Sequence, residues 1–261
     1  MAFTRATLLL GAALVLGSAQ GVLAADLYGG SMKDGPMIAP MAQATASWYV
    51  RVDGNYGGFD DPRVSEDGIY DLIDTSIENT WGVGGGVGVY FGHGLRGDIT
   101  VEHNFNSDVS ANLGDIYSAL PGTRKFSLSS TYALANMYYD FDTGNRFTPY
   151  IGVGLGFTKN KTGAGTVTDP CGCFSGEIAG GEDTHAAGAL MAGFSMKLRD
   201  RLSVDAGYRF LYLGEVETGA VTAKFNAAHG AFAAGAVVAQ DPTVDEIHEH
   251  QFRVGLRYDI Q

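Results

Sequence analysis

The sequence predicts an all-β protein, a transmembrane eight-stranded antiparallel up-and-down β-barrel. Three observations lead to this prediction: segments of alternating apolar and polar residues recur along most of the chain, the composition favours small and aromatic residues, and the links between segments alternate between short and long. A period of two is typical of strands whose two faces meet different surroundings. Alternating link lengths are typical of strands that run up and down around a barrel.

Eight segments carry the alternation. In the first, Trp48, Val50 and Val52 share one side, while Arg51 and Asp53 share the other. The fourth is irregular because its apolar residues change sides, which predicts a β-bulge near Asn136. The segments are 47–56, 81–91, 95–105, 126–141, 147–158, 185–198, 202–212 and 253–261.

The composition supports a barrel and excludes other classes. The chain has 38 glycines, 11% aromatic and only 18% charged residues, as expected for many strands with small residues on one face. Its net charge of -12 disfavours nucleic acid as a partner. Beyond the N-terminal segment no apolar run is long enough for a spanning helix, and a closed barrel is the other way to cross a bilayer.

The domain organisation has three parts. Residues 1–24 resemble a signal peptide, with Arg5 before an apolar stretch and small residues leading to cleavage after Ala24. A transmembrane helix would need about 20 apolar residues, and this run is shorter. Residues 25–46, rich in Gly, Met, Ala and Pro, read as a flexible leader. Residues 47–261 form the predicted barrel with four long external loops.

The links between segments give an independent test of the topology. Outer-membrane barrels have short periplasmic turns and longer external loops, and the links in this chain alternate in that manner. Both termini are then expected on the periplasmic side. The short turns are 92–94, 142–146 and 199–201, and the long loops are 57–80, 106–125, 159–184 and 213–247.

A soluble lipocalin-like barrel also alternates, but its apolar side chains would fill the interior. Export, glycine-rich opposite faces and aromatic residues at both ends of the segments favour apolar side chains that face lipid. The predicted external girdle is Trp81, Phe105, Phe126, Phe157, Tyr212 and Phe252; the predicted periplasmic girdle is Trp48, Phe91, Phe141, Phe147 and Tyr258.

The opposite parity places acids and bases in nearly equal numbers inside the barrel. Buried charges must be paired or hydrogen-bonded, so we expect a packed polar interior and no general pore like that of 16-stranded porins. The glycines could still widen one sector and permit a small leak. The predicted interior charges are Arg51, Asp53, Arg96, Asp98, Glu102, Asp205, Arg209, Arg253, Arg257 and Asp259.

The end of the chain resembles the C-terminal insertion signal of bacterial outer-membrane barrels. That signal has a polar residue, a glycine, an aromatic residue and an apolar residue at fixed spacing, matched here by Arg253, Gly255, Tyr258 and Ile260. Gln261 departs from the pattern, since such proteins usually stop on the apolar or aromatic residue.

Over residues 47–261 the chain resembles the small eight-stranded outer-membrane proteins of Gram-negative bacteria, the OmpA-like barrels often labelled porin-family surface antigens. The likeness is carried by residues 24–28, 136–141 and 149–156 and by the closing strand. It implies location in the cell outer membrane and insertion by the barrel-assembly machinery. Outer-membrane lipids and lipopolysaccharide are the expected partners, and the oligomeric state stays open.

No motif indicates catalysis, and we predict a protein that is not an enzyme and has no catalytic, cofactor or metal site. Ser129 and Ser130 have no assignable histidine partner, and His248 with His250 supplies only two metal ligands. Cys171 and Cys173, in an oxidising compartment, are a possible disulfide. The acidic residues of the first long loop most simply keep that loop solvated.

The predicted function is therefore structural: an integral outer-membrane barrel that supports envelope integrity, exposes acidic loops at the surface and lacks a large pore. A narrow porin-like channel for small solutes or ions is the main alternative. An outer-membrane lipid-modifying enzyme would need a serine, a histidine and a carboxylate together near one rim.

Overall fold

The computed structural model describes most of the predicted barrel. The signal peptide predicted at 1–24 and the leader predicted at 25–46 lie outside the described residues and stay predictions. The described residues are 47–60, 64–65, 70–115, 122–168, 172, 174–217, 219–226, 235, 237–240, 243–244 and 247–260.

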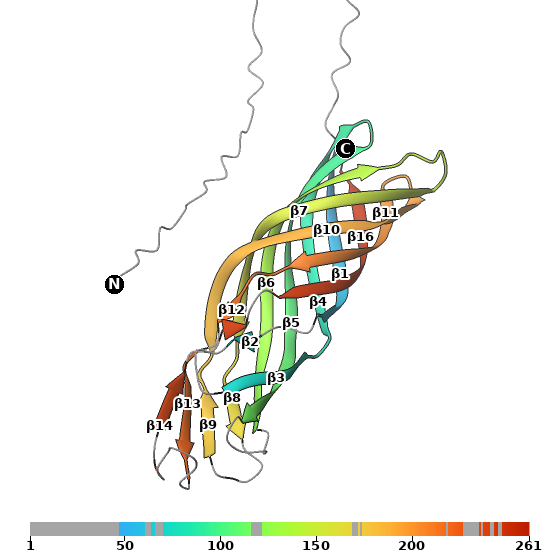
Figure 1. Ribbon diagram of the computed structural model, residues 1–261. Coiled ribbons are helices and arrows are strands. Elements are labelled where there is room, and N and C mark those ends of the chain that lie inside the picture. Colours follow the sequence, from blue (N-terminus) through green and yellow to red (C-terminus); the bar gives the residue numbers. More distant parts are fainter. Residues whose placement is uncertain are drawn as a thin grey trace, which may run out of the picture. The chain divides into compact units, whose positions relative to one another are not determined.

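Eight long antiparallel strands close into a barrel, as predicted, and run obliquely around it (Figure 1). Around the barrel their order is β6, β7, β10, β11, β16, β1, β4 and β5, and β5 pairs with β6 to close it. Within the described residues, no helix is long and apolar enough to cross a membrane. The barrel strands are β1 (Ser47–Phe59), β4 (Thr80–Gly92), β5 (Leu95–Asp115), β6 (Gly122–Asp140), β7 (Phe147–Thr162), β10 (Gly181–Arg199), β11 (Leu202–Tyr212) and β16 (His248–Asp259).

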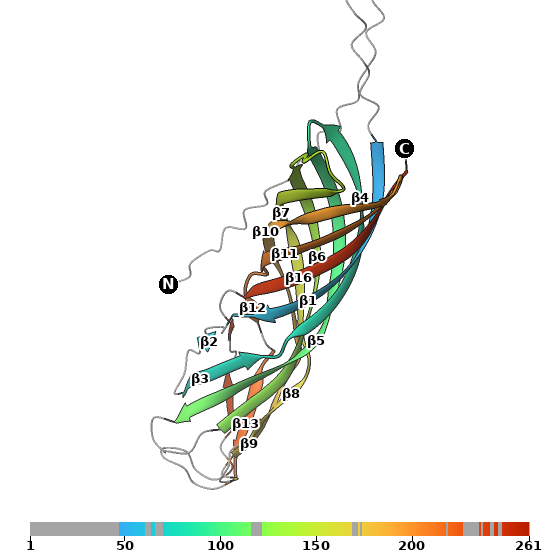
Figure 2. The same cartoon turned by 90° about the vertical axis from the view of Figure 1, so that its right-hand side faces the viewer.

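The long links are not simple loops, and this corrects the sequence prediction. β5 and β6 continue well past the barrel, and short strands add to their edges, forming what we call the loop-end extension (Figure 2). Several links thus form strands that extend the hydrogen-bonded sheet beyond the barrel. The additional strands are β2 (Val64–Ser65), β3 (Tyr70–Ile77), β8 (Gly165–Thr168), β9 (Phe174–Ile178), β12 (Val216–Glu217), β13 (Val221–Phe225), β14 (Val237–Gln240) and β15 (Thr243–Val244).

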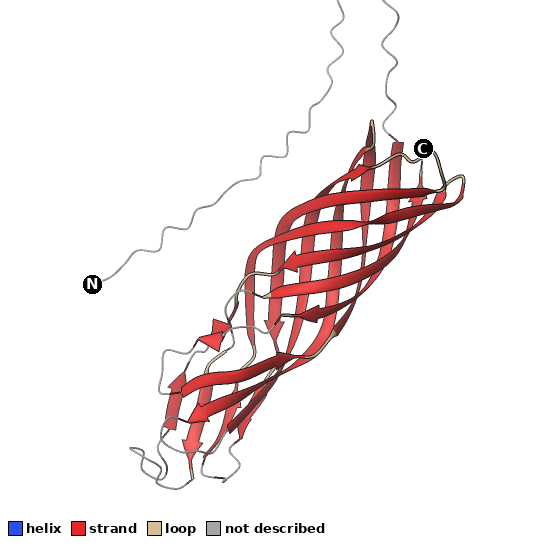
Figure 3. Ribbon diagram, turned by 45° about the vertical axis from the view of Figure 1, so that its right-hand side comes forward, coloured by secondary structure: helices blue, strands red, loops and turns tan. Residues whose placement is uncertain are grey.

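The opposite end of the barrel, which we call the turn end, has short connections, as predicted (Figure 3). Gly92, His93 and Gly94 all have positive φ in the tight turn between β4 and β5. Glycine adopts positive φ without steric cost, whereas for His93 this is an uncommon conformation, imposed by the tight turn. Beside this turn, the amide of Ile260 donates to the carbonyl of Trp48 at 2.7 Å, so the last strand is fastened to the first.

The outward face of the barrel is apolar, as the strand parity predicts. Val52, Trp81 and Leu155 are between 66% and 73% exposed, although all three are large hydrophobic side chains. A water-soluble fold would bury such residues, so this belt requires an apolar surrounding. Ten of the eleven predicted girdle aromatics are described as exposed or half-buried on this face; Phe126 is the exception, packing partly buried against the interior cluster.

The predicted bulge near Asn136 is wrong. β6 pairs without a shift along β7, and its even-numbered residues Leu128, Tyr132 and Leu134 point inward and are at most 2% exposed. Met137 and Tyr139 face outward on the other parity. The register instead shifts on β5, between Asn104 and Ser107, where the barrel gives way to the extension.

Candidate functional site: the charged barrel interior

The glycines of β4 make room for large polar side chains from neighbouring strands. A Cβ on Gly84 would lie 2.2 Å from the Glu102 side chain, and one on Gly88 would lie 2.2 Å from the Tyr49 ring. The missing side chains therefore correspond to volume already occupied. We expected that these glycines could widen one sector of the lumen. At Gly84 and Gly88 they do not, because the side chains of Glu102 and Tyr49 fill the space.

Glu102 of β5 holds the middle of the interior. Arg209 of β11 donates to both of its carboxylate oxygens, at 2.7 and 2.8 Å, and Arg253 of β16 donates to one of them at 3.0 Å. Tyr132 adds a hydrogen bond at 3.2 Å. In the strand order of the barrel β5 and β11 are diametrically opposite, so the Glu102–Arg209 pair spans the lumen.

A second ionic group lies nearer the turn end. Arg51 binds both oxygens of Asp53, at 2.6 and 2.8 Å, and donates to Asp98 at 2.9 Å. Asp98 also accepts hydrogen bonds from Tyr49 at 3.0 Å and Asn136 at 2.8 Å. The bidentate Arg51–Asp53 pair lies within β1 and fixes the orientation of the guanidinium, while the hydrogen bonds that Asp98 accepts link β5 to β1 and β6.

Further arginines close the turn end. Arg96 donates to Asp140 at 2.8 Å, and its guanidinium carbon lies 4.1 Å from the centre of the Tyr138 ring. Arg257 lies 3.2 Å from Asp205 and donates to Ser195 at 3.1 Å. A guanidinium over an aromatic face is held by the ring quadrupole as well as by its carboxylate.

The predicted interior residues are thus brought together. Nine of the ten predicted charges are at most 6% exposed, and Asp259 at the rim is half-buried. Apart from Arg124 in the extension, the buried ionic side chains of the described residues balance. They are the arginines 51, 96, 209, 253 and 257 and the carboxylates Asp53, Asp98, Glu102, Asp205 and Glu249.

Sequence reasoning missed Glu249 and Gln251. Both are fully buried: Glu249 accepts from Asn104 at 2.7 Å and from Gln251 at 2.8 Å, and Gln251 accepts from Arg209. The last segment was predicted to begin at Arg253. Continuing its alternation backward by two and four residues would have found both side chains.

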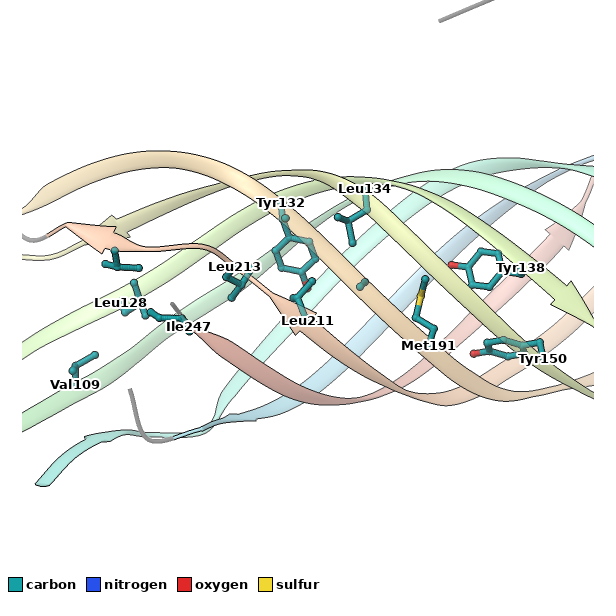
Figure 4. Packing of buried hydrophobic residues seen from close by; sticks show 13 residues of the cluster. Val109, Leu128, Tyr132, Leu134, Tyr138, Tyr150, Met191, Leu211, Leu213 and Ile247 are labelled. Atoms are coloured by element: carbon teal, nitrogen blue, oxygen red, sulfur yellow. The ribbon is translucent and has the colours of Figure 1, made fainter. Parts of the chain in front are cut away.

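The interior also has an apolar part that the sequence reasoning did not predict (Figure 4). Leu211, Leu213 and Ile247 are at most 2% exposed where the lumen meets the extension, and Leu134 and Met191 lie deeper. In Figure 4 these side chains lie in the space that the strands enclose. These apolar side chains fill part of the lumen at this level, beside the buried Asn160, whose amide donates to the Leu213 carbonyl at 3.0 Å.

The predicted insertion-signal residues divide between the two faces of β16. Arg253 lies inside, and Gly255 faces Asp53 so closely that a Cβ there would lie 2.1 Å from its carboxylate oxygen. Tyr258 and Ile260 are about half exposed on the outward face. That these residues act as an insertion signal stays a prediction.

The remaining candidates take simple structural positions. Cys171 and Cys173 lie outside the described residues, so their disulfide stays a prediction. His250 bonds Asp60 at 3.0 Å and also contacts the Tyr208 hydroxyl, while His248 stacks on Phe210. No group of three or more metal-ligating side chains is found in the described part of the chain.

Comparison with known proteins decides the family. A model of the outer membrane protein β-barrel domain matches residues 35–259. The chain belongs to this family. The protein is accordingly located in the outer membrane. In barrels of that membrane short turns lie on the periplasmic side and longer links outside, so we expect the loop-end extension to be external.

Individual proteins are also similar to this chain in sequence or in fold. The chain is 27% identical over 255 residues to an uncharacterised protein of Brucella abortus, covering 87% of this chain and 89% of that protein. It is 27% identical over 161 residues to the outer membrane protein PagN of Salmonella typhimurium, covering 58% and 66% respectively. Among solved structures, OprG of Pseudomonas aeruginosa covers 83% of this chain and 96% of its own, at 15% identity and a TM-score of 0.49.

Proposed function

We propose that the protein is a structural, surface-exposed outer-membrane barrel without a large pore. The observation that carries this proposal is the Glu102–Arg209 pair, which joins opposite strands across the lumen. Each carboxylate in the described interior has a charged or hydrogen-bonding partner, so the interior consists of packed side chains. Such a core stiffens the barrel and leaves transport without a path.

The external extension supports the surface-exposure part of the proposal. It carries exposed carboxylates and threonines on strands that continue beyond the apolar belt, so it reaches past the bilayer surface. Among the described residues, neither serine considered in the sequence analysis shows the partners of a hydrolase: Ser130 donates to Asn160 at 2.7 Å inside the barrel, and Ser129 donates to the Lys161 carbonyl at 3.5 Å. We therefore also propose that the protein is not an enzyme.

Deleting the gene tests the envelope role. A deletion strain is expected to become more sensitive to detergent, and the wild-type gene is expected to restore resistance. The matched control is a Val254→Arg variant, which puts a charge on the lipid face of β16 and is expected to fail because insertion costs roughly 2–4 kcal/mol more. Unchanged detergent resistance in the deletion strain would contradict the envelope role.

Surface exposure has its own test. In a Cys171→Ser, Cys173→Ser background, Thr222→Cys in the extension is expected to react with a membrane-impermeant thiol reagent on intact cells. Asp200→Cys, in the turn between β10 and β11, is expected to react only after permeabilisation. The reverse pattern would show that the extension faces the periplasm.

A further inference from the structure

The external extension contains a cavity that the structural role does not use. Its volume is about 980 Å³, and it lies against β5, β6, β8 and β9. Val109, Val167 and Ile178 on these strands are 2% exposed and point to the inside of the extension. Their neighbours Asp108, Thr166 and Glu177 also line the cavity and are exposed, so the cavity opens as a groove on the outward face, with Val109 and Ile178 contributing to its lining.

A row of polar side chains crosses this groove. Ser110 pairs with Lys125, Lys125 with Thr166, Thr166 with Glu177, and Glu177 with Thr222, each directly across neighbouring strands. Directly paired residues in a sheet have side chains on the same face, within about 4.5–5.5 Å of each other. Five strands therefore present one continuous line of hydroxyl, ammonium and carboxylate groups.

The charged groups of the row are held apart. Lys125 and Glu177 are two strand spacings from each other, roughly 9–10 Å, with Thr166 between them. Within the described part of the chain neither makes an ion pair, so both can hydrogen-bond a molecule lying across the row. Glu78 and Asp108 also line the groove, which makes it acidic on balance.

We propose that this groove binds an uncharged or amino-bearing saccharide. Closely spaced hydroxyl and carboxylate groups can donate to and accept from the hydroxyls of a sugar, and three carboxylates against one lysine repel sulfated or phosphorylated sugars. The volume is at the upper end of the usual range for small-molecule sites. This proposal goes beyond the structural role and does not depend on it.

The position of the groove allows two sources of this chemistry. On β6 the outward face becomes polar at Thr131, and the groove begins at Ser127, roughly 13 Å further along the strand. Both a free oligosaccharide and the sugar headgroup of a neighbouring outer-leaflet glycolipid can reach this height. Lipopolysaccharide carries phosphate groups, which the acidic groove repels, so a free oligosaccharide is the proposed ligand.

Purified, refolded full-length protein is titrated by calorimetry with a chitosan trimer, a neutral N-acetylglucosamine trimer, a heparin hexasaccharide and a de-acylated lipopolysaccharide saccharide. We expect the chitosan trimer to bind more tightly than the neutral trimer and heparin not to bind. The de-acylated saccharide keeps the phosphate groups of lipopolysaccharide, so we expect it not to bind; if it bound as tightly as the chitosan trimer, the proposed repulsion of phosphorylated sugars would be wrong.

Two variants locate the binding. Thr166→Trp, which fills the centre of the row, is expected to lower affinity at least tenfold. Thr168→Trp is the matched control, because Thr168 is exposed on the same strand and face but does not line the groove. Glu177→Gln is expected to remove the preference for the amino sugar. The proposal is overturned if no trimer binds at millimolar concentration, if heparin binds best, or if both tryptophan variants bind like the wild type.

Discussion

At the scale of single residues, Glu102 determines whether the interior charges are satisfied. Glu102 is 1% exposed, and its carboxylate pairs with both Arg209, at 2.7 Å, and Arg253, at 3.0 Å. Removing one partner of a buried ionic group leaves the others desolvated and unpaired, which costs far more than the pair itself contributes. Glu102 is thus the interior position where substitution should matter most.

Glu102→Ala is expected to lower the free energy of unfolding by about 3–5 kcal/mol, because buried Arg209 loses its paired carboxylate and Arg253 keeps the longer contact with Asp53, at 3.4 Å. Urea unfolding in lipid vesicles measures this value. Glu102→Gln keeps the size and part of the hydrogen bonding, so its loss should be smaller.

The matched control is Glu182→Ala, which breaks the ion pair with Lys159 on the outside of the sheet. Both side chains of that pair are more than 40% exposed, so solvent screening limits the loss to about 1 kcal/mol or less. If the two alanine variants were equally stable, the interior network would not hold the barrel together.

At the scale of strands, β4 depends on glycine because β5 fills the space beside it. In Gly84→Ala the new Cβ would meet the Glu102 Cγ at 2.2 Å and the Val101 carbonyl at 2.8 Å. We expect a loss of about 1–3 kcal/mol from overpacking. Gly54→Ala on the lipid face of β1 is the control, since its nearest neighbour is 4.0 Å away, and it should change stability by less than about 0.5 kcal/mol.

The last strand allows a test of the predicted insertion signal. Tyr258→Ala with Ile260→Ala is expected to reduce the amount of protein assembled in the outer membrane of cells, while leaving refolding into detergent micelles nearly intact. Tyr139→Ala is the control, because it removes a similarly exposed aromatic residue from β6. Equal loss in cells and in micelles would mean that the pair serves only stability.

The alternation predicted most of the barrel because strand period and parity are local properties of a sequence. It placed nine of the ten interior charges at positions that are buried, and Asp259 lies half-buried at the rim. It failed on β6, where Leu128, Tyr132 and Leu134 looked like lipid-facing residues but lie inside. Apolar residues satisfy both the interior and lipid, so only pairing with β5 and β7 fixes their side.

The extension could not be predicted for a related reason. Beyond the apolar belt both faces of a strand tolerate polar residues, so the two-residue period fades while pairing continues. The row from Ser110 to Thr222 joins residues more than 100 positions apart. Likewise, that Arg209 meets Glu102 depends on the order in which eight strands close, which no single segment encodes.

At the scale of the whole molecule, the barrel resembles an inverted soluble protein with an apolar exterior and an ionic interior. Ionic braces lie at the turn end and in the middle, and an apolar cluster lies where the lumen meets the extension. Two of these levels obstruct the lumen with ion-paired side chains and the third with apolar side chains. These layers support the proposal of a structural barrel over that of a channel.

Conductance of the refolded protein in planar lipid bilayers is the most direct test of this account. The account predicts no lasting conductance steps for the wild type, because the Glu102–Arg209 pair and the cluster around Leu213 fill the lumen. Boiled protein is the control for leakage caused by detergent. Reproducible steps from correctly folded wild-type protein would contradict the account and establish the narrow channel in its place.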